Sequence, residues 1–407
     1  MKRILLSTII LCAGLCANAQ GNNTRMGGED GDYQSLAERI AKIEKKNDMF
    51  NVYFNYAASA QASSYDGEWT SHFANKQLRL EIKGNLTDKI FYRLRHRMNK
   101  SNAAKGEDNF AKATDIMMVG YNVSDKLTLM GGKMCQIWGG FEFDENPMYI
   151  YQYSDMVDNM DNFMAGFVVS YKPVPTQEIA VEVSDANNGQ LNEDYGDYLV
   201  ALGPDHKVTP INPANHPLTF IVNWNGSFFN DKLQTRWSWG TQKQAKGKSS
   251  QMLIFGQRLN LPKLQWYFDY MGAWDGMDRL GIATSEGASA YLSGEEIDPA
   301  VVQNVRFQDV NYNSFITKLN WQFAPQWNLM LKGTYETSSV KNIDMMKNFR
   351  KSIGWAGSIE YYPDKSQDFR VFLAYIGHKN KYNDKIGLDS HNTNRIELGF
   401  MYRIKAY

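Results

Sequence analysis

The sequence contains very little cysteine and, beyond its first residues, no long apolar run. Only three of its 407 residues are cysteine, which excludes a disulfide-rich scaffold. After the N-terminus no stretch approaches the roughly 18 uncharged apolar residues that a membrane-spanning helix needs. A transmembrane β-barrel is not excluded by this test, because only every second residue of each strand must be apolar.

The sequence also has no excess of either charge and no catalytic motif. The 44 basic residues equal the 44 acidic ones, which argues against a nucleic-acid partner. None of the six histidines belongs to an HExxH motif, and there is neither a GxSxG motif nor a glycine-rich phosphate loop. We therefore expect no cofactor, no metal and no chemical step, although residues of different strands could still meet in an enzyme site.

The first 19 residues have the pattern of a secretory signal peptide. Two basic residues precede an apolar stretch at residues 4–15, and residues 17–19 read Ala-Asn-Ala, a cleavage site. The bulky leucines before Cys12 and Cys16 disfavour a lipoprotein signal. Cleavage would leave Cys135 as the one cysteine, and 42 basic against 44 acidic residues. We therefore expect an exported protein.

Two short segments follow the signal. Residues 20–32 are rich in Gly, Asn and Asp and are predicted to be a flexible linker. In residues 33–48 apolar positions recur every three or four residues, which predicts a short amphipathic helix of two heptads. Two heptads are too short to be stable alone. The helix therefore either lies on the rest of the protein or forms a short coiled coil that helps the chain to trimerise.

From residue 49 to residue 407 apolar and charged side chains alternate. In the hairpin at residues 77–97, Leu78, Leu80 and Ile82 share one face, and charged residues share the other. These runs are connected alternately by short turns and by longer polar segments. There are seven short turns, rich in Asn, Asp and Pro, and eight longer segments, which include residues 59–72, 134–162 and 241–250. This predicts an all-β fold: a 16-stranded antiparallel transmembrane β-barrel.

Two further features concern the predicted strands. Aromatic residues, 13% of the chain, gather near strand ends, where their rings suit the membrane interface. They are also common in ordinary β-rich cores, so a secreted β-rich binding protein remains an alternative. The last strand, residues 394–407, alternates well, yet Tyr407 falls on its charged face.

The charged strand faces should line the lumen, because a basic residue that faces lipid at mid-membrane costs about 2–4 kcal/mol. Basic residues outnumber acidic ones on these faces. The predicted basic lining of the pore is Arg79, Lys83, Arg93, Arg95, Arg97, Arg236 and Lys318.

The third long loop, residues 134–162, contains no Lys or Arg and several acids: Glu142, Asp144, Glu145, Asp155, Asp158 and Asp161. If it folds inward, an acidic loop faces a basic wall, with Arg93, Arg95 and Arg97 opposite residues 142, 144 and 145. Such charges set the ion preference of a pore. The alternative is that the arginines pair with acids of the barrel wall. The Asp-x-x-Asp-x-x-Asp run at 155–161 could bind Ca²⁺, but it lacks a known loop motif, and a solvated or arginine-paired loop is favoured.

The stretch Gly132-Lys133-Met-Cys-Gln-Ile-Trp138-Gly139, followed by Asn146-Pro147 and Tyr153-Ser154-Asp155, resembles the phosphate-selective porin O and P family. Cys135 stands where that family often has a basic residue, and Ile137 where it often has Pro. The resemblance implies a homotrimeric porin in the outer membrane of a Gram-negative bacterium, in contact with outer-membrane lipid.

The function expected is therefore passive diffusion of small hydrophilic solutes or small anions, with phosphate as the anion that the resemblance implies. The alternatives are an outer-membrane barrel enzyme of protease or lipase type and the secreted binding protein.

Overall fold

The computed structural model describes residues 34–41, 49–102, 111–189, 191, 199–294, 304–364 and 367–406. The predicted signal peptide, the linker at 20–32, residues 42–48 of the predicted helix and Tyr407 lie outside these described residues. Within the described residues, no helix is long and apolar enough to cross a membrane.

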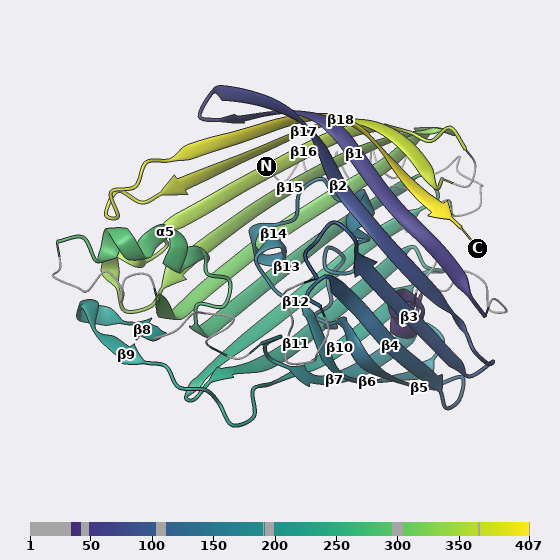
Figure 1. Ribbon diagram of the computed structural model, residues 1–407, viewed down its shortest axis with the longest axis horizontal. Coiled ribbons are helices and arrows are strands. Elements are labelled where there is room, and N and C mark those ends of the chain that lie inside the picture. Colours follow the sequence, from purple (N-terminus) through teal and green to yellow (C-terminus); the bar gives the residue numbers. More distant parts are fainter. Residues whose placement is uncertain are drawn as a thin grey trace.

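Sixteen antiparallel strands form a closed barrel, as the alternation of side chains predicted (Figure 1). They are β1 (Asn51–Tyr65), β2 (Glu68–Asn85), β3 (Ile90–Arg97), β4 (Thr114–Asn122), β5 (Leu127–Cys135), β6 (Phe163–Val174), β7 (Gln177–Asp185), β10 (Leu218–Phe228), β11 (Leu233–Ala245), β12 (Lys248–Leu261), β13 (Leu264–Met277), β14 (Val305–Ala324), β15 (Trp327–Val340), β16 (Arg350–Tyr361), β17 (Phe369–Tyr382) and β18 (His391–Lys405).

The barrel closes where the first strand meets the last. β1 pairs with β18 from Tyr53–Lys405 to Tyr65–Thr393, and it also pairs with β2. Two short strands, β8 (Val200–Leu202) and β9 (Val208–Pro210), lie in the long connection between β7 and β10, and β8 adds in parallel to the start of β14.

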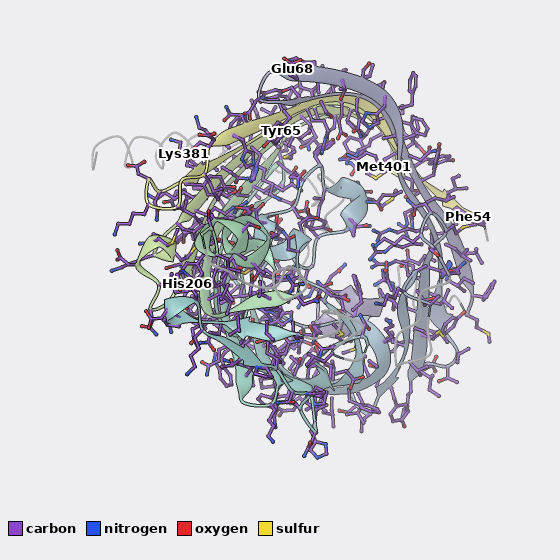
Figure 2. The ribbon with its side chains drawn as sticks, turned by 60° about the vertical axis from the view of Figure 1, so that its left-hand side comes forward. Phe54, Tyr65, Glu68, His206, Lys381 and Met401 are labelled. Carbon is purple, nitrogen blue, oxygen red and sulfur yellow. The ribbon has the colours of Figure 1, made fainter. Side chains whose placement is uncertain are left out.

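The two faces of the wall differ in chemistry as the alternation requires. Leu331 and Leu398 point outward and are 48% and 57% exposed in the isolated chain, whereas inward-pointing Lys318 and Glu397 are 3% and 0% exposed. Figure 2 shows the same contrast for Phe54 outside the wall and Met401 inside it. The continuous apolar outer surface is suited to lipid, and the polar groups are gathered in the interior.

Two segments predicted as long loops are instead parts of strands. The interpretation of residues 59–72 was wrong, because Asp66 and Gly67, with φ of 46° and 97°, make a two-residue turn between β1 and β2. Asp-Gly is a favoured sequence for such a turn, which needs positive φ at both positions. Residues 241–250 likewise belong to β11 and β12, joined at Lys246 and Gly247. Residues 241–250 are polar on almost every position and residues 59–72 are mostly small or polar, so neither segment shows a clear apolar alternation.

Short helical elements fill the interior and one end of the barrel. They are α2 (Leu36–Ala41), η2 (Pro147–Tyr149), α3 (Asp155–Asp158), η3 (Pro204–His206), α5 (Ile282–Tyr291) and η4 (Asp344–Met346). α5 packs at the long-loop end near β14, and Asp278 holds its first turn by accepting from the backbone N–H groups of Gly281 and Thr284 at 2.9 and 2.8 Å.

Candidate functional site

The connection between β5 and β6, residues 136–162 and here called the inner loop, folds into the lumen. Carboxylates of the wall accept hydrogen bonds from its backbone: Glu182 on β7 from Ile137 N at 2.7 Å, and Glu336 on β15 from Asp155 N at 2.7 Å. Asp269 on β13 accepts from two consecutive N–H groups of the loop, at 2.8 and 2.9 Å. The loop is therefore fastened to the wall by its backbone as well as by its side chains.

Two glycines let the loop come close to the wall. Gly139 and Gly140 have φ of +79° and +72°, a region that side chains disfavour. A Cβ added at Gly140 would lie 3.2 Å from Oδ2 of Asp269 and 3.1 Å from Cγ2 of Ile254. The backbone can reach the carboxylate of Asp269 because no side chain stands between them.

The acids of the inner loop pair with basic residues on one side of the barrel. Asp144 binds Nη1 of Arg236 on β11 at 3.0 Å, and Asp155 binds Nη1 of Arg350 on β16 at 2.6 Å. Two further ion pairs join Glu145 to Lys318 on β14 and Glu142 to Lys332 on β15. The predicted constriction acids are thus partly neutralised by the wall that the loop leans on.

The opposite wall carries a cluster of arginines around one carboxylate. Asp115 on β4 lies 2.6 Å from Nε of Arg97, 3.0 Å from Nη2 of Arg95 and 3.7 Å from Nη1 of Arg79. Nη1 of Arg79 has no hydrogen-bond partner among the described residues. Arg93 pairs separately with Glu81 at 2.7 Å. Three guanidinium groups therefore share a single negative charge.

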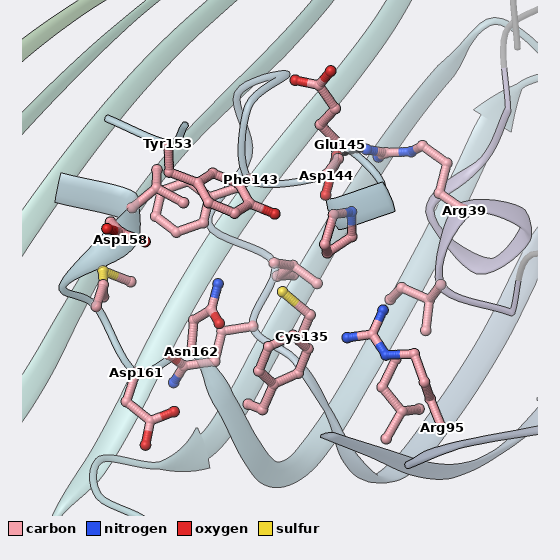
Figure 3. Close-up of a pocket in the computed structure, with 18 of the residues that line it drawn as sticks. Arg39, Arg95, Cys135, Phe143, Asp144, Glu145, Tyr153, Asp158, Asp161 and Asn162 are labelled. Carbon is pink, nitrogen blue, oxygen red and sulfur yellow. Dashed lines mark hydrogen bonds and ion pairs between the residues drawn. The ribbon is translucent and has the colours of Figure 1, made fainter. Parts of the chain in front are cut away.

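A cavity of about 440 Å³ lies between this cluster and the inner loop (Figure 3). The cations that line it include Arg79, Arg93, Arg95 and Arg97. The ring centroid of Phe163 lies 5.1 Å from Cζ of Arg95 and 5.8 Å from Cζ of Arg97. The acids that line it are Asp144, Glu145, Asp158 and Asp161. Of the other predicted site residues, Lys83, Arg236, Lys318, Glu142 and Asp155 face the interior but lie outside the lining of this cavity.

The acids at the far side of the cavity belong to α3 and the residues after it. Asp158 has no salt-bridge partner within the described part of the chain, and burial together with the charges of Asp155 and Glu142 raises its pKa. Asp161 accepts from Nδ2 of Asn188 at 2.8 Å. Asp155 is held by Arg350, and the described residues contain no group of three His, Cys, Asp or Glu placed to hold a metal ion.

Comparison with known proteins identifies the family. A family profile described as phosphate-selective porin O and P matches residues 50–404, which is nearly the whole barrel. The chain belongs to this family. It is an outer-membrane porin, and the family is one of channels.

Solved structures show the same fold in other outer-membrane proteins. The porin aligns with the outer membrane channel DcaP of Acinetobacter baumannii with a TM-score of 0.60 and 10% identity, over 92% of this chain and 99% of that chain. OmpF of Salmonella typhi, in complex with daunomycin, gives 0.53 and 10%, over 89% and 99%. OmpT of Vibrio cholerae in its trimer form gives 0.51 and 9%, over 88% and 100%. A search of curated protein sequences finds no significant match.

The charged residues of the site that sequence reasoning missed include Asp115, Arg39 and Lys100. Asp115 was omitted because strand parity is ambiguous around it, and Arg39 because α2 was not placed. Arg39 lines the cavity and forms an ion pair with Asp144, and Figure 3 shows it reaching toward the inner loop from the helix. Cys135 also lines the cavity.

Proposed function

We propose that this porin passes small hydrophilic solutes by passive diffusion and prefers anions. The observation that carries the proposal is the shared carboxylate of Asp115, around which the arginines at positions 79, 95 and 97 hold two more positive than negative charges. Buried cations with unused N–H donors can take the place of the water around a passing anion.

Phosphate is the anion that the family description names. The lining of this cavity, however, contains acidic as well as basic side chains. Asp158 and Asp161 stand across the cavity from the arginines, and Cys135 is uncharged where a further cation is frequent. These acids reduce the net positive charge of the lining, on which strong selection of a multiply charged anion depends. We therefore propose a general preference for small anions rather than strict selection of phosphate.

We also propose that the porin assembles as a homotrimer after export through a cleaved signal peptide. The support for a trimer is the similarity of the barrel to OmpT of Vibrio cholerae, which was solved in a trimer form. The support for export is the pattern of residues 1–19. Gel mobility of unheated, detergent-extracted protein, compared with chemically cross-linked protein, tests the trimer.

The anion preference is tested by neutralising the cluster. In the triple variant R79Q/R95Q/R97Q we expect the reversal potential in a salt gradient to move toward the cation value, since Asp115 then remains without compensating charge. The control is K385Q, which removes a positive charge from an exposed loop side chain paired with Asp344. Heat-modifiable gel mobility verifies that each variant is a folded barrel. A reversal potential equal to that of the unmodified porin would refute the proposal.

A further inference from the structure

The helix α2 lies inside the barrel. Leu36 and Ala37 are 2% and 8% exposed, and they belong to the same buried apolar cluster as Ile116 and Ile137. Leu36, Arg39 and Ile40 line the cavity that holds the arginine cluster. This helix therefore forms part of the wall of the permeation pathway, although it precedes the barrel in sequence.

Three polar contacts hold α2, each to a different part of the molecule. The backbone N–H of Leu36 donates to Oε2 of Glu178 on β7 at 2.6 Å. The carbonyl of Ile40 accepts from Nη1 of Arg93 on β3 at 2.5 Å. Arg39 pairs with Asp144 of the inner loop. The first two partners lie close to the short turns before β7 and β3, which places α2 toward the short-turn end of the lumen.

Each of these partners keeps another contact if α2 leaves. Asp144 is also bound by Arg236 at 3.0 Å, and Arg93 is also bound to Glu81 at 2.7 Å. Glu178 also accepts from the hydroxyl of Ser170. Undocking therefore leaves no buried charge of the barrel without a partner, which is the main cost of breaking such contacts elsewhere.

The helix itself is weakly held. It has six residues, too few for a helix to be stable by itself. Nε and Nη2 of Arg39 are buried without a hydrogen-bond partner in the described part of the chain, and such groups gain hydration when they are exposed. In the docked position the apolar side chains of α2 are buried, but the guanidinium group of Arg39 lacks part of its hydrogen bonds.

We propose that α2 is a displaceable plug that narrows the pathway at the short-turn end and that Arg39 and Leu36 hold it in place. When it is docked, it covers one side of the arginine-lined cavity. When it leaves, the cavity opens toward the short turns, and the barrel wall and the inner loop keep their own ion pairs. The plug would act on conductance whether or not the pore prefers anions.

The test uses two variants of the full chain in planar bilayers. R39A removes the ion pair with Asp144, and L36D places a charge in the apolar contact. Both should raise single-channel conductance above that of the unmodified porin, and L36I, which keeps the apolar contact, should not. If L36D does not fold into a heat-modifiable barrel, the conductance of R39A alone tests the proposal.

Cys135 provides a second readout, because it lines the same cavity as α2. A hydrophilic thiol reagent should modify it several-fold faster in R39A and L36D than in the unmodified porin, and the C135S background identifies any label placed elsewhere. Unchanged conductance in folded variants would overturn the plug, and so would a rise in conductance without faster labelling. Reversal potentials from the same recordings report the anion preference separately, so the two proposals fail independently.

Discussion

The carboxylate of Asp115 accepts a hydrogen bond from Nε of Arg97 at 2.6 Å, and the same carboxylate is the counter-ion of two further arginines. The balance of charge beside the cavity therefore depends on one acidic side chain of β4.

Replacing Asp115 by Asn should make the pore more selective for anions. The cluster then holds three positive charges without a negative one, and local repulsion should also lower the stability of the barrel. The reversal potential in a salt gradient measures the first effect, and the urea midpoint of unfolding from lipid vesicles measures the second. D389N, which neutralises an acid in an exposed loop, is the matched control. A reversal potential that moves toward cations would contradict the assignment.

Removing the side chain of Asp269 should loosen the inner loop. This carboxylate accepts from the N–H groups of Phe141 and Glu142, and a typical intramolecular hydrogen bond contributes about 0.5–1.5 kcal/mol. We expect D269A to show larger and noisier single-channel currents, because a loop that leaves its place widens the lumen. E68A, at the exposed turn after β1, removes a carboxylate far from the loop and should leave the currents unchanged. Quiet currents of normal size in D269A would show that the loop is held without this contact.

The ion preference should depend on pH through Asp158. Burial and the neighbouring acids Asp155 and Glu142 raise its pKa above the ordinary value of about 3.9, and Lys332 and Arg395 partly oppose this. As the pH falls through the raised pKa, the carboxyl takes up a proton and the cavity loses one negative charge. Anion preference should therefore increase at a higher pH than an exposed aspartate would allow.

Reversal potentials recorded across a pH series check this step. The step should disappear in D158N and should persist in D161N, whose altered side chain lines the same cavity. A pH profile that is identical in D158N and the unmodified porin would assign the titration to another group.

The outer face should tolerate charge only near its edges. Leu331 points outward midway between Trp327 and Tyr335 on the same face of β15, so it is expected at the middle of the membrane. L331R should lower the free energy of unfolding by about 2–4 kcal/mol, and T337R, beyond Tyr335, should lower it by about 1 kcal/mol or less. Urea titrations in vesicles of one lipid composition measure both. Equal costs for the two variants would place the membrane elsewhere on the strand.

The period-two pattern was enough to predict the closed barrel, because it reports the face of each side chain. It failed at Asp115 for a physical reason. The register shifts between Arg95 and His96, so that β4 bulges and both Asp115 and Ile116 turn inward. A bulge breaks the alternation, and a residue beside it cannot be assigned to a face by counting.

Partners were harder to predict than faces. The sequence shows that Glu142 is acidic and Lys332 basic, but nothing local indicates that residues 190 positions apart would meet. The inner loop was expected to oppose the arginines of β3, and two of its three acids, Asp144 and Glu145, do line the cavity with them. Glu142 instead turns away to Lys332. Which acid turns which way depends on the path of the loop, and that path is set by glycines and backbone contacts.

The pairing of β1 with β18 has a consequence for the order of assembly. The strand that starts the wall cannot gain its second neighbour until the last residues of the chain have been synthesised and delivered to the membrane. The inner loop, whose contacts extend from β7 to β18, can be completely fastened only after that. A chain truncated within its last strand would therefore lose the finished passage together with the seam of the barrel, although every residue around the arginine cluster would still be present.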